Sequence, residues 1–189
     1  MGGKLIIFSA PSGAGKTSIV RALLAKMPEM EFSVSACSRP MRPGETDGVD
    51  YYFLTPEDFR QKISEGLFLE WEEVYPGSYY GTLITEVDRI WAKGRHVIFD
   101  VDVAGGINIK KKYVDKALSI FVMPPSIEEL KKRLLGRKTE TAESLAKRID
   151  KAEQEIGYAA QFDRVVVNDR LEDAIHEAEK LLKNFLGQP

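Results

Sequence analysis

The sequence predicts an α/β fold in which a parallel β-sheet forms the core and helices flank it. Short apolar runs with β-branched and aromatic members indicate buried strands at residues 4–9, 97–101, 117–122 and 164–167. Each run is followed by a segment whose apolar residues recur at helical spacing. Alternation of strand and helix along a chain is typical of a parallel sheet.

Length and composition limit the classes of protein that the chain can be. Its 189 residues are about one domain long, and 43% hydrophobic with 30% charged residues is ordinary for a globular protein. The net charge of −2 argues against a nucleic-acid partner. The longest apolar runs are far shorter than the roughly 18 residues that cross a bilayer, so we expect no membrane span. A single cysteine, Cys37, fits a reducing, cytoplasmic location.

Four helices have recognisable ends or apolar faces. The helix after residue 16 ends before Pro28, because proline cannot continue the helical hydrogen bonding. Ser126 and Glu129 form a capping-box pattern, and Thr55 precedes Pro56 at the start of a short helix. The last helix carries an apolar stripe at positions 174, 175, 178, 181, 182 and 185.

Two inserts interrupt the alternation of strand and helix. Residues 31–89 are rich in aromatic residues, glycine and proline, and strand-like pieces at 50–53 and 68–75 predict a small mixed lobe. Residues 136–144 are polar and charged, and we interpret them as a lid between two helices. We therefore expect one domain over residues 1–189, with its core at about 1–30 and 90–189.

A glycine-rich loop follows the first predicted strand. Its sequence matches the phosphate-loop pattern GxxxxGK[ST], with alanine in place of the first glycine: Ala10, Pro11, Ser12, Gly13, Ala14, Gly15, Lys16, Thr17. Lys16 is expected to contact the β and γ phosphates of a nucleoside triphosphate, and the Thr17 hydroxyl to bind Mg²⁺. The alternative, an incidental glycine-rich turn, does not explain the strand before the loop and the helix after it. Because alanine replaces glycine at position 10, we expect this residue to have no positive φ angle.

Two carboxylates, Asp100 and Asp102, end the predicted strand at 97–101. In open α/β sheets this edge binds ligands, so both side chains are candidates for the phosphate site, with Asp100 contributing to the Mg²⁺ site through water. The alternative is that the pair caps the helix that follows.

The 31–89 insert contains further residues that suggest a second substrate. Ser35, Arg39, Arg42 and Tyr51 are followed by Glu70-Trp71 and by Tyr79-Tyr80-Gly81-Thr82. Together with the phosphate loop and Asp100-Val101-Asp102, these residues resemble the guanylate kinase family, whose members phosphorylate GMP with ATP. The resemblance extends from residue 5 to about residue 185 and implies a P-loop nucleoside monophosphate kinase fold.

The resemblance implies a role for each matching position. Arg39, Arg42, Tyr51 and Tyr80 would bind the GMP phosphate, and arginine's forked donors suit that task. The guanine contacts would be Ser35, Glu70, Thr82 and Asp102. Guanine offers N–H donors that a carboxylate accepts, whereas adenine has no donor at N1. Taken singly, these arginines also fit an exposed surface, the tyrosines a core, and Glu70 an edge strand.

Arg133, Arg137 and Arg148 lie in or beside the predicted lid. The resemblance implies that they close over the triphosphate, with Arg137 and Arg148 stabilising the transferring group together with Lys16. Asn168 would lie near the adenine. In two places the sequence departs from the family pattern: Ala104 replaces a common glutamine, and a longer loop at 75–78 leaves Tyr79 and Tyr80 as alternatives, of which we choose Tyr80.

The resemblance implies ATP:GMP phosphotransfer with Mg²⁺, and we expect a monomer or a homodimer. Alignment and charge stabilisation would carry the reaction without a covalent intermediate. Two alternatives remain. One is a kinase for another nucleoside monophosphate, against which Glu70 and Asp102 argue. The other is a guanylate kinase-like protein-interaction module, against which the complete phosphate loop argues.

Overall fold

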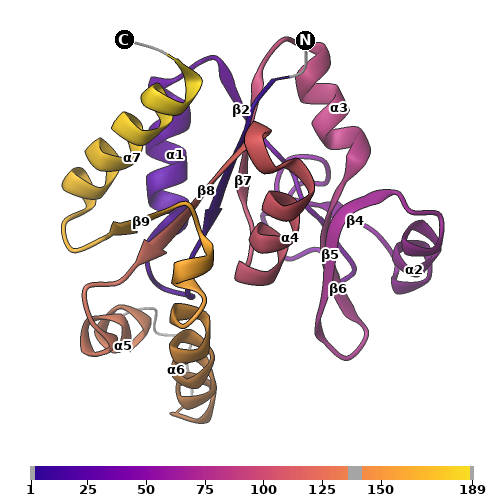
Figure 1. The fold of residues 1–189 in the computed structure, drawn as a ribbon. Coiled ribbons are helices and arrows are strands. Elements are labelled where there is room, and N and C mark those ends of the chain that lie inside the picture. Colours follow the sequence, from indigo (N-terminus) through magenta and orange to yellow (C-terminus); the bar gives the residue numbers. More distant parts are fainter. Residues whose placement is uncertain (1–2, 136–141, 188–189) are drawn as a thin grey trace. The chain divides into compact units, whose positions relative to one another are not determined.

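The computed structural model describes residues 3–135 and 142–187, except for the side chains of residues 142–144. The chain divides into two compact units (Figure 1). The small unit consists of Met1–Gly3 and Glu29–Val97, and the large unit of Lys4–Pro28 and Ile98–Pro189. The predicted lid at 136–144 and its Arg137 lie outside the residues whose side chains are described.

The elements follow one another as strands and helices throughout the described chain. The strands are β1 (Leu5–Ser9), β2 (Met30–Phe32), β3 (Ala36–Cys37), β4 (Tyr52–Phe53), β5 (Phe68–Tyr75), β6 (Ser78–Leu83), β7 (His96–Asp100), β8 (Ala117–Met123) and β9 (Arg164–Val167). The α-helices are α1 (Lys16–Lys26), α2 (Pro56–Ser64), α3 (Ile84–Ala92), α4 (Val103–Tyr113), α5 (Ile127–Leu135), α6 (Ala142–Ile156) and α7 (Leu171–Leu186).

The predicted parallel sheet is confirmed. Its strand order is β2-β7-β1-β8-β9, and β8 pairs in parallel with both β1 and β9. The chain enters the sheet at β1, continues at β2 and β7 on one side of it, and then at β8 and β9 on the other side. This reversal places a ligand-binding position of open α/β sheets at the carboxyl end of β1, where the glycine-rich loop begins.

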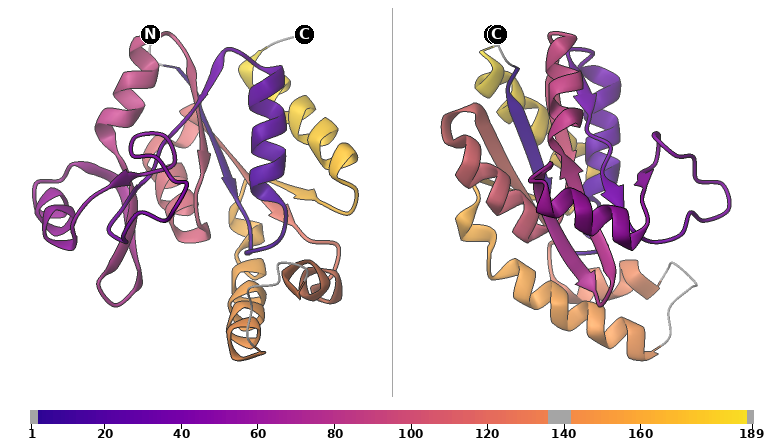
Figure 2. Two further views of the ribbon diagram at one scale, coloured as in Figure 1. Left: turned by 180° about the vertical axis from the view of Figure 1, so that it is seen from behind. Right: turned by 90° about the vertical axis from the view of Figure 1, so that its right-hand side faces the viewer.

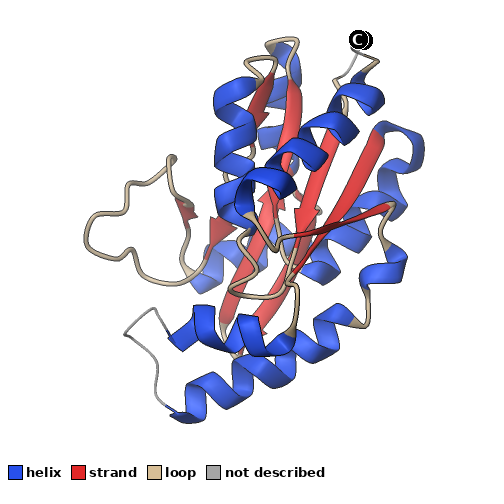
Figure 3. Ribbon diagram, turned by 90° about the vertical axis from the view of Figure 1, so that its left-hand side faces the viewer, coloured by secondary structure: helices blue, strands red, loops and turns tan. Residues whose placement is uncertain are grey.

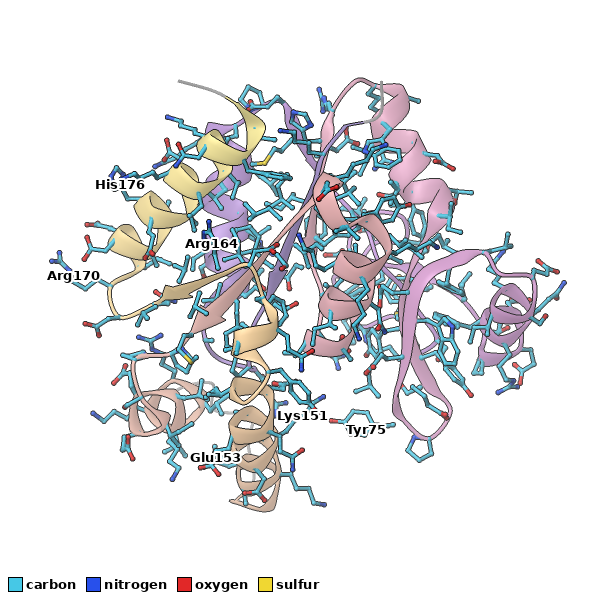
Figure 4. The ribbon with its side chains drawn as sticks, viewed as in Figure 1. Tyr75, Lys151, Glu153, Arg164, Arg170 and His176 are labelled. Carbon is cyan, nitrogen blue, oxygen red and sulfur yellow. The ribbon has the colours of Figure 1, made fainter. Side chains whose placement is uncertain are left out.

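Helices cover the sheet because its central strands are apolar on both faces. All five residues of β1 are buried, as expected for a strand packed on both sides. Figure 2 shows α1 and α4 on opposite sides of β1, and α7 packs against α1 and β9. The predicted stripe of α7 holds, with Ala174, Ala178 and Leu182 buried and His176 pointing outward (Figure 4).

Two predicted helix starts are confirmed, one of them in part. The Thr55 hydroxyl accepts a hydrogen bond from the Asp58 N–H at 3.0 Å and caps α2. The Ser126 hydroxyl accepts the Glu129 N–H at 3.1 Å at the start of α5. The Glu129 carboxylate, however, accepts a hydrogen bond from the Arg133 guanidinium one turn later. Helices α5 and α6 pack together through Leu130, Leu134 and Ala152 with partly buried neighbours (Figure 3).

The small unit contains the expected mixed sheet, with strand order β4-β3-β6-β5. Strands β3 and β4 are parallel, whereas β6 is antiparallel to both β3 and β5. A cluster of Ala36, Phe59 and Phe68 forms its core, and the Phe59 and Phe68 rings stack at 4.3 Å between centroids. Gly81 lets β6 approach β5 closely, since a Cβ there would lie 2.6 Å from the Glu70 carbonyl oxygen.

Two carboxylates, Glu31 and Glu86, bind basic residues at positions 89–95 of the small unit. Glu31 on β2 forms ion pairs with Arg89, with Lys93 at 2.7 Å and with Arg95 at 3.0 Å. Burial raises the pKa of Glu31, but the hydrogen bonds from Lys93 and Arg89 outweigh it and lower that pKa to about 2. Glu86, 2% exposed, accepts hydrogen bonds from the Val34 N–H, the Tyr52 hydroxyl and Arg89. These contacts connect β2, β4 and α3.

None of the helices in residues 3–135 and 142–187 is both long and apolar enough to cross a membrane.

Candidate active site

The glycine-rich loop begins where β1 ends and leads directly into α1. Gly13 and Gly15 both have φ of 93°, a conformation that side-chain-bearing residues rarely adopt. Ala10, in contrast, is not among the described residues with positive φ, so alanine is tolerated at the first motif position. The loop is closed by a hydrogen bond from the Ala14 N–H to the Pro11 carbonyl at 3.1 Å. Successive backbone N–H groups of such a loop, at a helix N-terminus, bind phosphate oxygens.

Lys16, Thr17 and Asp100 form one polar cluster beside this loop. The Lys16 ammonium lies 2.7 Å from one Asp100 carboxylate oxygen and donates to the Val101 carbonyl at 2.5 Å. The Thr17 hydroxyl donates to the other Asp100 oxygen at 2.7 Å. The side chains of Lys16 and Asp100 are 16% and 15% exposed, so the pair is partly shielded from water. A cation, a hydroxyl and a carboxylate are thus held together at the start of α1.

The two aspartates have separate roles, because β7 ends at Asp100. Asp102 caps α4 by accepting the Gly105 N–H at 2.7 Å. Its carbonyl accepts a hydrogen bond from the Ser9 hydroxyl at 2.9 Å, which ties the start of α4 to the end of β1. The helix-cap alternative therefore applies to Asp102, whereas Asp100 contacts Lys16 and Thr17 beside the glycine-rich loop.

The oxygens of Thr17 and Asp100 are of the kind that Mg²⁺ prefers. The residues in the described ranges contain no group of three or more histidine, cysteine, aspartate or glutamate side chains placed to hold a metal ion. The pair thus fits an ion that takes its remaining ligands from nucleotide phosphates and water, as Mg²⁺ commonly does.

Three further residues predicted for the ATP site lie in the large unit. The Arg148 guanidinium on α6 donates to the Ser12 hydroxyl of the loop at 3.5 Å. The Asn168 amide donates to the Ala14 carbonyl at 2.7 Å. Arg133 donates to the Asn168 carbonyl at 3.0 Å and to Glu129, so its guanidinium binds protein groups around the loop.

Glu155 on α6 is a candidate that the sequence reasoning missed. Its side chain is 14% exposed and lies 3.8 Å from the Lys151 ammonium. The pKa of Glu155 is raised overall. Burial is the largest cause and the nearby Asp102 adds to it, whereas Lys151 and Lys16 lower the pKa. The charge of Glu155 thus interacts with those of Lys16 and Asp102. Its spacing of seven residues from Arg148, which puts both on one face of a helix, is the signal that could have found it.

In the small unit, Arg39 is the centre of a second cluster. Both of its terminal nitrogens donate to the Glu45 carboxylate, at 2.7 and 2.6 Å, and the guanidinium lies 5.0 Å from the centre of the Tyr51 ring. Glu45 also accepts the Arg42 N–H at 2.8 Å. The hydrogen bonds from Arg39 and Arg42 hold the pKa of Glu45 at about 2, and Glu45 in turn raises the pKa of Arg39.

Glu45 was not predicted, although its spacing of three residues from Arg42 repeats the spacing between Arg39 and Arg42. It orients the first arginine and holds the backbone of the second. The Arg42 side chain itself is exposed.

The two neighbouring tyrosines of β6 lie in different surroundings. Tyr79 stacks on Phe59 at 5.5 Å between ring centroids and joins the apolar core of the unit. Tyr80 meets the edge of the Tyr51 ring at 6.0 Å, and after Glu45, the largest cause, Tyr80 also contributes to the raised pKa of Arg39. Successive residues of a strand face opposite sides of the sheet, which separates the two rings. Tyr80 is therefore the tyrosine gathered with Arg39 and Tyr51.

Glu70 and Thr82 form a buried polar pair on the neighbouring strands β5 and β6. They are directly opposite in the strand register, and the Thr82 hydroxyl donates to the Glu70 carboxylate at 2.7 Å. Their exposures are 8% and 0%. Ser35, at intermediate exposure, precedes β3, and its carbonyl accepts the Tyr52 N–H at 2.9 Å. The structure thus pairs two of the predicted guanine contacts with each other, and places Asp102 in the large unit.

The chain is similar to known guanylate kinases. A family model described as guanylate kinase matches residues 2–185. A guanylate kinase of Bacteroides thetaiotaomicron is 56% identical over 188 residues, covering 100% of this chain and 92% of the relative. One of Bacteroides fragilis is 53% identical over 184 residues, covering 97% of this chain and 90% of the relative.

Solved structures give the same result. The crystal structure of guanylate kinase from Anaplasma phagocytophilum superposes with a TM-score of 0.77 at 29% identity, covering 97% of this chain and 86% of that one. A shikimate kinase from Bacteroides thetaiotaomicron, at 15% identity and a TM-score of 0.51, shares the fold. With a family model over nearly its whole length and relatives above 50% identity, the chain belongs to the guanylate kinase family.

Proposed function

We propose that the chain transfers the γ-phosphoryl group of ATP to the phosphate of GMP, giving ADP and GDP. The observation that carries this proposal is the buried pair of Glu70 and Thr82 in the same unit as the cluster of Arg39, Tyr51 and Tyr80. A carboxylate accepts the N–H donors of guanine, and an arginine with aromatic neighbours suits a phosphate monoester. The small unit thus contains both kinds of group that recognition of GMP requires.

On the donor side, we propose that the glycine-rich loop binds the triphosphate of ATP. Lys16 neutralises charge on the β and γ phosphates, and Arg148 reaches the loop from α6. Thr17 would hold Mg²⁺, with Asp100 contributing through water, and the ion would supply neutralisation of the phosphate charge. Arg137 stays a predicted catalytic residue. Ala10, Pro11, Ser12, Gly13, Ala14 and Gly15 supply the loop backbone.

The acceptor phosphate is ionised near neutral pH, so no strong general base is needed. Catalysis then depends on alignment and on stabilisation of the charge that spreads over the transferring group. Ser35, Arg42 and Asp102 stay predicted GMP contacts. The division of the chain into a core at about 1–30 and 90–189, a GMP-binding lobe at 31–89 and a lid at 136–144 also stays a prediction.

The proposal places this activity in the cytoplasm. Cys37 is buried and free, as is usual for proteins of reducing compartments. A monomer or a homodimer is expected.

The test is ADP release from magnesium ATP with AMP, GMP, CMP, UMP or dTMP at equal concentration. We expect strong stimulation by GMP alone, because guanine is the only one of the five bases with two adjacent donors, N1–H and the amino group, for the Glu70 carboxylate. Stimulation by another nucleotide would keep a kinase but remove the guanine assignment. ATP binding without stimulation by any of the five would favour a protein-interaction module.

A further inference from the structure

Asn168 joins the end of one strand to the phosphate-binding loop. It follows β9 directly, and its backbone N–H donates to the Met123 carbonyl at 2.8 Å, which continues the pairing of β8 and β9. Its side-chain amide donates to the Ala14 carbonyl at 2.7 Å, and the residue is 4% exposed. The contact is buried, so water does not readily replace it.

This contact fixes the direction of a whole peptide group. The described residues contain no cis peptide bond, and in a trans peptide the C=O and the following N–H point in opposite directions. An Ala14 carbonyl held toward Asn168 therefore points the Gly15 N–H away from Asn168. Gly15 has φ of 93°, and a Cβ there would lie 2.2 Å from the Asn168 amide nitrogen. The glycine and the asparagine thus fit together as a pair.

Asn168 is itself held by groups from α5. The Arg133 guanidinium donates to the Asn168 carbonyl at 3.0 Å and to the Asp169 carbonyl at 3.4 Å. Its third nitrogen donates to Glu129 at 3.2 Å, in the first turns of the same helix. The bonds of Arg133 and of the Asn168 side chain thus go to other protein groups near the loop.

We propose that Asn168 is a positioning residue that sets the orientation of the Ala14–Gly15 peptide, so that the Gly15 N–H faces the nucleotide phosphates, and that Arg133 holds Asn168 in place. The proposal rests on the proposed binding of ATP phosphates at this loop. A positioning role differs from an adenine contact in one measurable respect. If Asn168 positions the loop, it affects the binding of any ligand with phosphates, including one without a base.

The test uses Asn168→Asp, which keeps the shape of the side chain but replaces the donor with an ionised acceptor facing the Ala14 carbonyl. The probe is inorganic tripolyphosphate with Mg²⁺, titrated calorimetrically into the full chain, with ATP titrated in parallel. We expect both affinities to fall by a similar factor, about ten- to a hundred-fold, as for a buried acceptor left without its donor. The control is Asn184→Asp on α7, the same substitution at an exposed position, which should leave both affinities unchanged.

Two outcomes would overturn the proposal. Unchanged tripolyphosphate affinity with weakened ATP binding would make Asn168 a base contact, and no change in either would remove the role altogether. If Asn168→Asp does not fold, Asn168→Ser is titrated in the same way, because its hydroxyl is too short to reach Ala14 and the same direction of change is expected. If GMP does not stimulate ADP release by the wild-type protein, the proposed acceptor is refuted. The comparison of tripolyphosphate with ATP binding still tests the role of Asn168, because GMP takes no part in it.

Discussion

Lys16→Ala should remove most of the activity and leave the fold in place. A unit charge about 4 Å from the charge on the transferring group contributes about 4 kcal/mol at an effective dielectric constant of about 20. Loss of a preorganised donor of this kind commonly costs about 2.7–4 kcal/mol, which is about 10²- to 10³-fold in kcat. We therefore expect kcat with saturating magnesium ATP and GMP to fall by at least about a hundred-fold.

The structure explains why the fold should survive this change. Without Lys16, the Asp100 carboxylate keeps the Thr17 hydroxyl at 2.7 Å as its partner. The cost is then about 1–3 kcal/mol for the lost charged hydrogen bonds, against a typical total stability of about 5–15 kcal/mol. For a chain of this length that corresponds to a drop in Tm of about 2–12 °C.

The assay is ADP release at 25 °C, with thermal unfolding of the same preparations. The matched control is Lys26→Ala, which removes a half-exposed lysine of the same helix whose ammonium lies 2.9 Å from the Glu179 carboxylate. This variant should retain wild-type turnover, because surface ion pairs contribute little and Lys26 lies at the far end of α1. A folded Lys16→Ala protein with turnover near the wild-type value would refute the reasoning.

Three further predictions address the small unit. Glu45→Gln should raise the KM for GMP by about ten-fold with little change in the KM for ATP, because the Arg39 guanidinium loses its charged partner. The control is Glu57→Gln, which changes an exposed ion pair with Arg60. A KM for GMP equal to the wild-type value in Glu45→Gln would contradict the prediction. The carboxylate of Glu31, with its pKa lowered to about 2, stabilises the fold above its ordinary pKa of 4.5, and this contribution disappears as the pH falls toward 2. Urea unfolding of Glu31→Gln should therefore depend less on pH between about 5 and 2, and parallel curves would count against the assignment. Thr82→Val, which removes the hydrogen bond to Glu70, should weaken GMP binding at equilibrium several-fold and leave ATP binding alone; unchanged GMP affinity would remove Thr82 from the site.

Strands were predictable where their own sequence is apolar or alternates. Residues 164–167 and 68–75 form β9 and β5 with the predicted bounds, because β-branched and aromatic residues favour a pleated, half-buried backbone. Strand β3 is two residues long, and β6 has the polar sequence SYYGTL. These two are strands because β6 pairs with both β3 and β5. Such pairing partners come from tertiary structure, which local propensity does not include.

The carboxylates at the end of β7 show a second limit. Their two-residue spacing implies one shared face only if the strand continues to Asp102, and the strand ends at Asp100. From the sequence, the choice between a strand end and a helix cap depends on placing the strand boundary to within one residue. The ends of elements are uncertain by at least that much. The cap is visible in the structure as the hydrogen bond from the Gly105 N–H.

The roles that the sequence did not identify share one property: the side chains concerned act on other protein groups. Motifs at fixed spacing, such as the loop ending in Lys16, bring their residues together because the local backbone curls around one phosphate group. Asn168 meets Ala14 across 154 positions of sequence, so no local spacing can encode that contact. Glu45 lies near Arg39 in the sequence, but its role depends on how the intervening loop folds. In this chain the predicted ligand contacts follow from motifs in the sequence, whereas the groups that orient those residues become visible only in the folded chain.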